Sequence, residues 1–232
     1  MKDITITTYT WDIIDANSYL IKDGENAVLI DVVENESLYE AIKEIKKLTV
    51  ILTHCHYDHI AGLNQLREIK PDVKVCSTSV CSEYIGDPNR NLSIISEAFL
   101  AFYLKTDIED EEYKRKLKMI SIFSCAPCDI TFEDEMTLEL SGHTFKLSRF
   151  YGHSNDSLIA ILDDKYMFSG DTILGIPTAT RFPKGSTMKF WREDIPRLLE
   201  LSDTIELVYP GHGKPGKLID MINGNERPEK YK

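Results

Sequence analysis

Hydrophobic and polar residues alternate along the first thirty positions, which is the pattern of half-buried β-strands. The stretch ITITTYT alternates strictly, and the stretches NSYLIKD and NAVLID follow it on either side of an Asp23-Gly24 turn. Apolar residues then repeat every three or four positions, which predicts a helix over residues 37–46. The next run, TVILT at residues 49–53, is continuously apolar and predicts a short strand buried on both faces.

The same two patterns return farther along the chain. Residues 60–69 predict a helix and VKVCS predicts the next strand. Further strands are predicted at DITF, MTLEL, HTFKLSRF, SLIAILD and KYMFS, then a helix at residues 189–201 and a strand at IELVYP. We expect the polar tail NGNERPEKYK to fray. Strands and helices in two successive halves favour a layered α/β sandwich over a doubly wound sheet.

The segment at about residues 82–123 has a different character. NLSIISEAFLAFYLK is apolar almost all round, and TDIEDEEYKRKLK is highly charged, and both are compatible with helices. We interpret this segment as a helical insertion in one domain that spans residues 1–232. Two roles stay open: the insertion covers core, or it forms a lid or a dimer face near an active site. The apolar residues around Phe99 and Phe102 are compatible with a homodimer.

Composition narrows the class of protein. The formal net charge of −11 disfavours non-specific binding of nucleic acid. The N-terminus lacks a basic region followed by an apolar one, and no window approaches the ~18 apolar residues of a membrane span. We therefore expect a cytoplasmic protein with no membrane partner. No GxGxxG or GxxxxGK[ST] motif occurs, so nucleotide binding of those kinds has no support.

The five cysteines are expected to be reduced thiols, because the number is odd and the chain is not a small secreted framework. Cys125 and Cys128 form a C-x-x-C pair that leads into a strand, whereas redox pairs precede a helix. Ordinary thiols are the favoured interpretation. A four-thiolate zinc site with Cys76 and Cys81, and redox chemistry, remain alternatives.

The stretch THCHYDHIAG, residues 53–62, contains three of the six histidines of the chain. Imidazole and carboxylate groups are ligands of borderline divalent metals such as zinc. In a loop that follows a rigid strand, the spacing H-x-H-x-D-H can serve two metal ions. Further candidates follow other predicted strands, each beside a glycine: His153, Asp171 and His212. Asp31 closes the strand NAVLID in the same way, while His143, in the turn SGHTF, is expected to be an ordinary surface histidine.

The order of these motifs, Asp31, H-C-H-Y-D-H, G-H-S, S-G-D-T and P-G-H-G, resembles the metallo-β-lactamase superfamily over about residues 3–222. Within it, the pattern is similar to the glyoxalase II-like (hydroxyacylglutathione hydrolase-like) and lactonase-like branch. The resemblance implies a four-layer αβ/βα sandwich with the site at one edge between two β-sheets. It also implies two divalent metal ions, zinc in the first place and iron or manganese as alternatives.

The resemblance assigns a role to each candidate residue. His54, His56 and His153 would hold the first metal, and Asp58, His59 and His212 the second. Asp171 would bridge the two metals, and Asp31 would support the site through hydrogen bonds. Cys55, between two of the ligands, is either an inert small residue or an oxidation-prone neighbour of the metals.

The implied activity is hydrolysis of a small ester, thioester or lactone by a hydroxide held between two metals, with Asp58 as the catalytic residue that orients it or shuttles a proton. Antibiotic-hydrolysing zinc β-lactamases usually lack an aspartate bridge of this kind, so that activity is not expected as the main role. The alternatives are an iron-dependent oxidoreductase of the same fold, similar to persulfide dioxygenases, a phosphodiesterase, and a non-catalytic scaffold. No G-x-S-x-G elbow supports a serine nucleophile.

Substrate contacts are the least determined part of the site. Glyoxalase II enzymes carry a C-terminal helical domain that helps to bind glutathione, whereas this chain ends about twenty residues after His212, which puts glutathione thioesters in doubt. Tyr151 could line the pocket, and Arg181 and Lys184 could hold a carboxylate or phosphate of a small-molecule substrate. The alternative is that the basic stretch is only solvated.

Overall fold

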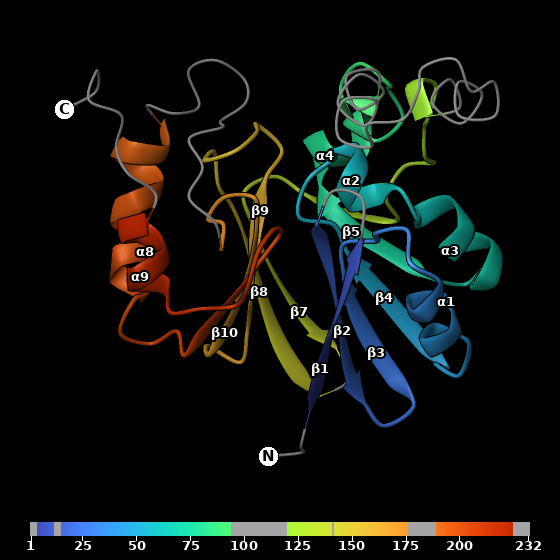
Figure 1. Ribbon diagram of the computed structural model, residues 1–232, viewed down its shortest axis with the longest axis horizontal. Coiled ribbons are helices and arrows are strands. Elements are labelled where there is room, and N and C mark those ends of the chain that lie inside the picture. The colour runs from blue at the N-terminus through green and yellow to red at the C-terminus, as the bar shows by residue number, and fades with distance from the viewer. Residues whose placement is uncertain (1–3, 12–14, 94–119, 141, 176–188, 225–232) are drawn as a thin grey trace.

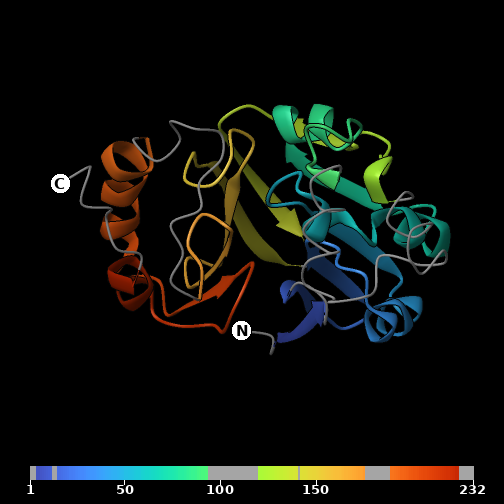
Figure 2. The ribbon, with the colours of Figure 1, turned by 45° about the horizontal axis from the view of Figure 1, so that its top comes forward.

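Two β-sheets lie face to face in the computed structural model, and helices cover the outer face of each sheet (Figure 1). The structure describes residues 4–11, 15–93, 120–140, 142–175 and 189–224. Helices α1 to α4 lie on one side and α8 and α9 on the other, and the second view preserves these layers (Figure 2). The predicted four-layer αβ/βα sandwich is confirmed.

The first sheet has six strands in the order β1-β2-β3-β4-β5-β6. The strands are β1 (Thr5–Trp11), β2 (Ala16–Asp23), β3 (Asn26–Ile30), β4 (Lys47–Ile51), β5 (Lys74–Thr78) and β6 (Ile130–Phe132). β1, β2 and β3 pair antiparallel, and β3 to β6 run parallel. The carboxyl ends of β3 and β4 therefore meet at the same edge of this sheet.

The second sheet has five strands in the order β11-β10-β9-β8-β7. The strands are β7 (Glu135–Leu140), β8 (His143–Arg149), β9 (Leu158–Leu162), β10 (Tyr166–Gly170) and β11 (Leu207–Pro210). β8 and β10 are both antiparallel to β9, and β11 is parallel to β10. β8, β10 and β11 therefore also end at one edge.

The helices are short, and two of them begin with a side-chain cap. They are α1 (Glu36–Lys43), α2 (Tyr57–Ile60), α3 (Leu63–Ile69), α4 (Ser79–Tyr84), α8 (Ile195–Leu201) and α9 (Leu218–Gly224), with a π-helical turn η1 (Phe190–Asp194) before α8. The Asn35 side chain accepts a hydrogen bond from the Leu38 N–H and begins α1, and Thr78 does the same for α4. Sequence patterning did not predict α9.

Residues 57–69 form two helices where the periodicity predicts one helix over residues 60–69. The break falls at Gly62, where a β-carbon would lie 2.6 Å from both the Tyr39 hydroxyl and the Val33 carbonyl oxygen. The chain turns there against its own core, so that α2 can point back toward the strand ends while α3 covers the sheet.

Three apolar layers hold the sandwich together, one under each set of helices and one between the sheets. Strand β4 shows how one strand serves two layers. Leu48 and Val50 pack under the helices, and Ile51 packs between the sheets. Because successive side chains point to opposite faces, a continuously apolar run is what such a strand requires.

No helix within the described ranges has the length and apolar character needed to cross a bilayer. Most of the predicted insertion at about residues 82–123 lies outside the described residues, so both of its proposed roles stay predictions. Helix α2 lies at the upper end of the strands in Figure 1, at the edge where β4 ends.

Candidate metal centre

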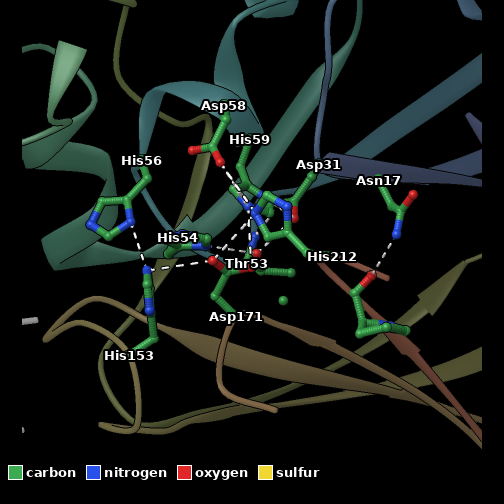
Figure 3. A network of polar contacts seen from close by, with 12 residues as sticks. Asn17, Asp31, Thr53, His54, His56, Asp58, His59, His153, Asp171 and His212 are labelled. Carbon is green, nitrogen blue, oxygen red and sulfur yellow. Dashed lines mark hydrogen bonds and ion pairs between the residues drawn. The ribbon is translucent and has the colours of Figure 1, made fainter. Parts of the chain in front are cut away.

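Seven polar side chains from both sheets converge at the carboxyl ends of the strands (Figure 3). His54 and His56 lie in the loop after β4, and Asp58 and His59 lie on α2. The other three follow β8, β10 and β11: His153, Asp171 and His212. Long-range pairing of the strands therefore brings together residues that are far apart in the sequence.

The first group consists of His54, His56 and His153, here called the histidine trio. Their nearest ring nitrogens all lie within 4.8 Å of one another, and all three side chains are buried. His56 Nδ1 and His153 Nε2 are 2.8 Å apart. Two donors to one tetrahedral zinc ion stand about 3.4 Å apart, so this trio has the spacing of a ligand set.

The second group consists of Asp58, His59 and His212, here called the mixed trio, and its ligand atoms also lie within 4.8 Å of one another. Asp58 Oδ2 is 3.2 Å from His212 Nε2 and 3.8 Å from His59 Nε2. One carboxylate and two imidazoles again form a donor set that divalent cations accept.

Asp171 lies between the two trios, as Figure 3 shows. Its Oδ1 is 3.3 Å from His59 Nε2, and its Oδ2 is 3.5 Å from His212 Nε2 and 3.6 Å from His153 Nε2. One carboxylate thus faces a histidine of each trio, which is the arrangement that a bridging ligand requires.

Asp31 holds the ligand loop, residues 53–59, through hydrogen bonds, and these bonds determine the tautomers of His54 and His59. Asp31 accepts hydrogen bonds from the Thr53 N–H (2.7 Å), the Thr53 hydroxyl (2.7 Å) and His59 Nδ1 (2.8 Å). Because the Thr53 hydroxyl donates to Asp31, its oxygen accepts from His54 Nδ1 at 3.0 Å. Both Nδ1 atoms therefore carry the proton, and the Nε2 lone pairs of His54 and His59 are available to a metal.

The buried Nε2 of His54 has no hydrogen-bond partner among the described residues. A buried polar atom of this kind costs free energy unless it is satisfied. A bound cation satisfies it, so the donor set fits divalent metal ions. A third convergent group, Asp31 with His54 and His59, is also close enough. However, the Asp31 oxygens already accept three hydrogen bonds, which favours a supporting role for Asp31.

Charge is concentrated where the trios meet. Burial alone would lower the pKa of His59, but the carboxylates of Asp171, Asp58 and Asp31 together raise that pKa well above its usual value. Burial also opposes protonation of His212, yet Asp171 and Asp58 raise its pKa to about 9. Burial lowers the pKa of His54 well below its usual value. The mixed trio thus attracts positive charge strongly, whereas burial keeps the pKa of His54 and that of His56, in the histidine trio, below the usual value.

Two glycines allow the backbone to approach the centre. A β-carbon on Gly211 would overlap the Asp171 carboxylate and lie 2.7 Å from His59 Cε1. Gly170 has a φ of +48°, and a β-carbon there would lie 2.5 Å from the Thr53 hydroxyl. Glycine at both positions is therefore a steric requirement of the site.

The predicted substrate contacts are only partly within the described chain. Two cations lie over the half-buried Tyr151 ring: the Lys189 ammonium is 3.9 Å from the ring centroid, and the Arg149 guanidinium is 5.1 Å from it. A contact with substrate stays a prediction for Tyr151. Arg181 and Lys184 lie outside the described residues.

Burial makes the cysteines poor candidates for chemistry. Cys55 is 1% exposed, its Sγ lies 3.5 Å from the Arg90 carbonyl oxygen, and burial raises its pKa well above the usual value. Burial also raises the pKa of Cys125 to about 12 and that of Cys128 to about 11. The three convergent ligand groups found within the described chain contain no cysteine. These observations favour ordinary thiols over redox chemistry or a thiolate zinc site.

The prediction that His143 is a surface residue is wrong. His143 is 7% exposed, and its Nδ1 lies 2.7 Å from Asp163 Oδ2. His143 pairs with Leu140 in the β7–β8 hairpin and its side chain points into the sandwich. It lies at the amino end of β8, away from the ligand loops, which follow the carboxyl ends.

Three residues that hold the centre were missed by sequence reasoning: Asn17, Thr53 and Asp156. Asn17 Nδ2 donates to the Pro210 and Gly213 carbonyl oxygens, which precede and follow His212 in the sequence. Asp156 Oδ2 accepts from the Cys55 N–H at 2.6 Å, between two histidines. The available signal was a polar residue beside a predicted strand end, but the partner in each long-range bond is invisible in one sequence.

A groove of about 490 Å³ lies away from the centre, over the outer face of β7, β8 and β9 beside α8. Its lining includes Glu135, Lys146, Ile161 and Arg197 and none of the seven convergent residues. The chemistry of the donor set, and not the size of this groove, identifies the functional site.

Comparison with known proteins gives a consistent result. A family model described as the metallo-beta-lactamase superfamily matches residues 11–212. The chain is 23% identical over 228 residues to the beta-lactamase-like protein 2 homolog of Drosophila melanogaster, over 92% of this chain and 65% of that protein. It is 26% identical over 220 residues to a probable metallo-hydrolase of Methanocaldococcus jannaschii, over 87% of this chain and 89% of that protein.

A third relative is the atrochrysone carboxyl ACP thioesterase of Aspergillus fumigatus, 22% identical over 205 residues, which cover 85% of this chain and 50% of that protein. The chain thus spans about two thirds of the length of the Drosophila protein and half of the length of the thioesterase.

Two solved structures illustrate the similarity of fold. The BLEG-1 B3 metallo-beta-lactamase matches with a TM-score of 0.74 and 21% identity, over 94% of this chain and 97% of that one. The di-iron-bound form of TTHA1623 matches with a TM-score of 0.66 and 22% identity, over 94% and 98%. At these identities the similarity shows the fold alone.

Proposed function

The chain belongs to the metallo-beta-lactamase superfamily, and from that premise we propose that it is a metal-dependent hydrolase of small esters, thioesters or lactones. The observation that carries the proposal is the convergence of two donor trios on one central carboxylate, Asp171. Zinc is the proposed metal, since histidine and carboxylate are its usual ligands.

His54, His56 and His153 would hold one ion, Asp58, His59 and His212 the other, and Asp171 both. Ions bound there would lower the pKa of a coordinated water from about 15.7 toward 7, which makes a nucleophile available at neutral pH. Asp31 and Thr53 keep the imidazoles of His54 and His59 in the tautomer that presents Nε2.

Asp58 is the most exposed of the three carboxylates at the centre. Its side chain is 19% exposed, against 8% for Asp171 and 2% for Asp31. His212, 13% exposed, lies beside it. The centre is therefore open on the side of Asp58 and His212, and we propose that substrate approaches there and that Asp58 orients the attacking water or accepts its proton.

The choice of carbonyl substrates rests on what the centre offers and lacks. Two cations held by these residues would supply Lewis acidity toward a carbonyl oxygen. Cys55, the nearest thiol in sequence, is buried with a raised pKa and does not serve as a nucleophile. The thioesterase among the relatives supports thioesters as a substrate class.

The test is a panel of chromogenic thioesters, lactones, aryl esters and phosphodiesters, assayed with zinc-loaded protein. We expect hydrolysis of at least one carbonyl class, abolished by a chelator and restored by added metal. Asp58→Asn is expected to lower kcat by about 100-fold, as loss of a general base does. Asp129→Asn, which alters a surface carboxylate bonded to Lys74, is the matched control. Turnover of phosphodiesters alone would contradict the proposal.

An iron-dependent oxidoreductase is the second candidate, and one observation favours it. A protein of the same fold was solved in a di-iron-bound form, and nitrogen and carboxylate donors also bind iron. Elemental analysis of protein purified without added metal, an absorption spectrum, and oxygen consumption with a persulfide separate the two candidates. Iron at two equivalents with persulfide-dependent oxygen uptake would replace the hydrolase proposal.

A further inference from the structure

Asp156 is a buried carboxylate that joins the two loops of the histidine trio. It is 1% exposed, and its Oδ2 accepts a hydrogen bond from the Cys55 N–H at 2.6 Å. Its Oδ1 accepts from the Ser154 hydroxyl at 2.7 Å. Cys55 lies between His54 and His56, and Ser154 follows His153, so one side chain contacts the loops that carry all three histidines.

The surrounding contacts make this junction rigid. The Leu158 N–H donates to the Thr53 carbonyl oxygen at 2.8 Å, and the Thr78 hydroxyl donates to the Asp156 carbonyl oxygen at 2.9 Å. Because Ser154 donates its proton to Asp156, the Ser157 hydroxyl donates to Ser154 Oγ at 2.7 Å. The hydrogen bonds thus run from Ser157 through Ser154 and end on the carboxylate.

Asp156 and Asp31 both form hydrogen bonds to the ligand loop, residues 53–59, but at different residues. Asp31 bonds the N–H of Thr53 and the ring of His59, while Asp156 bonds the N–H of Cys55 and the loop of His153. Asp31 thus contacts a histidine of the mixed trio, whereas Asp156 contacts the two loops that carry the histidine trio. The mixed trio has a carboxylate of its own, Asp58, whereas the histidine trio consists of three imidazoles and has none.

We propose that Asp156 is the positioning residue of the histidine trio: it sets the separation of the His56 and His153 rings and places a carboxylate behind the three imidazoles. A carboxylate behind metal-binding imidazoles typically changes metal affinity by about 10- to 100-fold. The inference rests on the proposed metal-dependent function and specifies how one half of the centre obtains its affinity.

The experiment measures zinc affinity by competition with a chromophoric chelator in two backgrounds, each with one trio disabled. In His212→Ala the histidine trio is intact, and there Asp156→Asn is expected to weaken zinc binding by about 10- to 100-fold. In His153→Ala the mixed trio is intact, and the same change is expected to alter affinity by less than about threefold, because Asp156 contacts no residue of that trio. Asparagine keeps the shape of the side chain and removes its charge.

Asp163→Asn is the matched control, since Asp163 also accepts one backbone N–H, from Thr144, and one side-chain group, the His143 ring. Its substitution should leave zinc affinity unchanged in both backgrounds. Cobalt substitution adds a second readout: Asp156→Asn should shift the visible absorption of the ion in the His212→Ala background only.

The outcomes are distinguishable. Equal losses of affinity in both backgrounds, or no loss in either, would overturn this inference and leave the proposed function standing. Unmutated protein that takes up no metal would overturn the proposed function and the inference together. Should Asp156→Asn fail to fold, Ser154→Ala removes one of its two hydrogen bonds and keeps the charge. A smaller loss, again confined to the His212→Ala background, is then expected, and its absence overturns the inference.

Discussion

Two buried histidines of this chain each contact a carboxylate through Nδ1, at nearly the same distance. His59 lies 2.8 Å from Asp31 at the carboxyl ends of the strands, and His143 lies 2.7 Å from Asp163 at the opposite end. The first pair is exposed by only 0% and 2%, the second by 8% and 26%. The two contacts are thus nearly equal in length, although the Asp163 carboxylate is more exposed than that of Asp31.

Their Nε2 atoms make the difference. His59 Nε2 faces Asp171 at 3.3 Å and Asp58 at 3.8 Å, whereas His143 Nε2 is buried without a hydrogen-bond partner in the described chain. A histidine–carboxylate contact therefore does not make a metal site. A metal site needs further donors from other strands, and among the described residues such donors converge at the carboxyl edge of the sandwich.

The largest expected effect is that of removing the carboxylate shared by both trios. Asp171→Ala should lower hydrolytic activity and metal content far more than a supporting residue does, by at least about 100-fold in kcat/KM. Steady-state kinetics and elemental analysis of the same preparation check this. Retention of two tightly bound metal ions would contradict the central position assigned to Asp171.

The next effect compares the two carboxylates directly. Asp31→Asn should weaken metal binding by about 10- to 100-fold, because the tautomers of His54 and His59 depend on Asp31. Asp163→Asn should lower the melting temperature about as much as Asp31→Asn does, but it should leave metal affinity unchanged. Chelator competition and thermal denaturation of both variants provide the measurement. Equal changes in metal affinity would erase the distinction between the two ends.

A smaller effect is expected from one methyl group at the metal edge. Gly211→Ala forces a β-carbon against Asp171 and His59, and overpacking of this kind costs about 1–3 kcal/mol. We expect lower stability together with about tenfold weaker metal binding. Gly224→Ala is the control, since nothing lies within 4 Å of its added β-carbon. Denaturant titration with and without metal distinguishes them, and indistinguishable variants would contradict the steric argument.

The smallest effect should come from a residue inside the ligand motif that points away from the centre. Cys55 packs in the apolar layer under the helices, so Cys55→Ala should change activity by less than about threefold and cost about 1 kcal/mol of stability. The native protein should also resist inactivation by dilute hydrogen peroxide as well as the variant does. Strong protection by the substitution would favour the oxidation-prone alternative.

Local pattern predicted most of the strands, because alternation and continuous apolar runs report which faces of a strand are buried. Residues 218–224 escaped prediction as a helix because seven residues with a terminal glycine carry too few turns for a periodic signal. Residues 57–69 form two helices instead of one, and a β-carbon on Gly62, between the two, would meet Val33 and Tyr39. Such contacts between distant segments are not encoded in any local window.

In the candidate site, too, local patterns could be predicted and contacts between distant segments could not. The seven candidate residues could be named because each stands at a predicted strand end beside a turn, and the structure brings them together, while their roles as ligands stay predictions. His143 could not be distinguished from a surface histidine, because its burial depends on the pairing of β7 with β8. Asp156 was missed because its bond to Cys55 joins segments that no spacing rule connects.

The division of donors between the two sheets has a consequence for biosynthesis. A ribosome synthesises His54 to His59 well before His212, and at 5–20 residues per second this interval is roughly 8–30 s. During that time the nascent chain contains the donors of the ligand loop, His54 to His59, without His212. The complete donor set therefore exists only after His212 has been synthesised, and the donors of the ligand loop precede it by most of the domain.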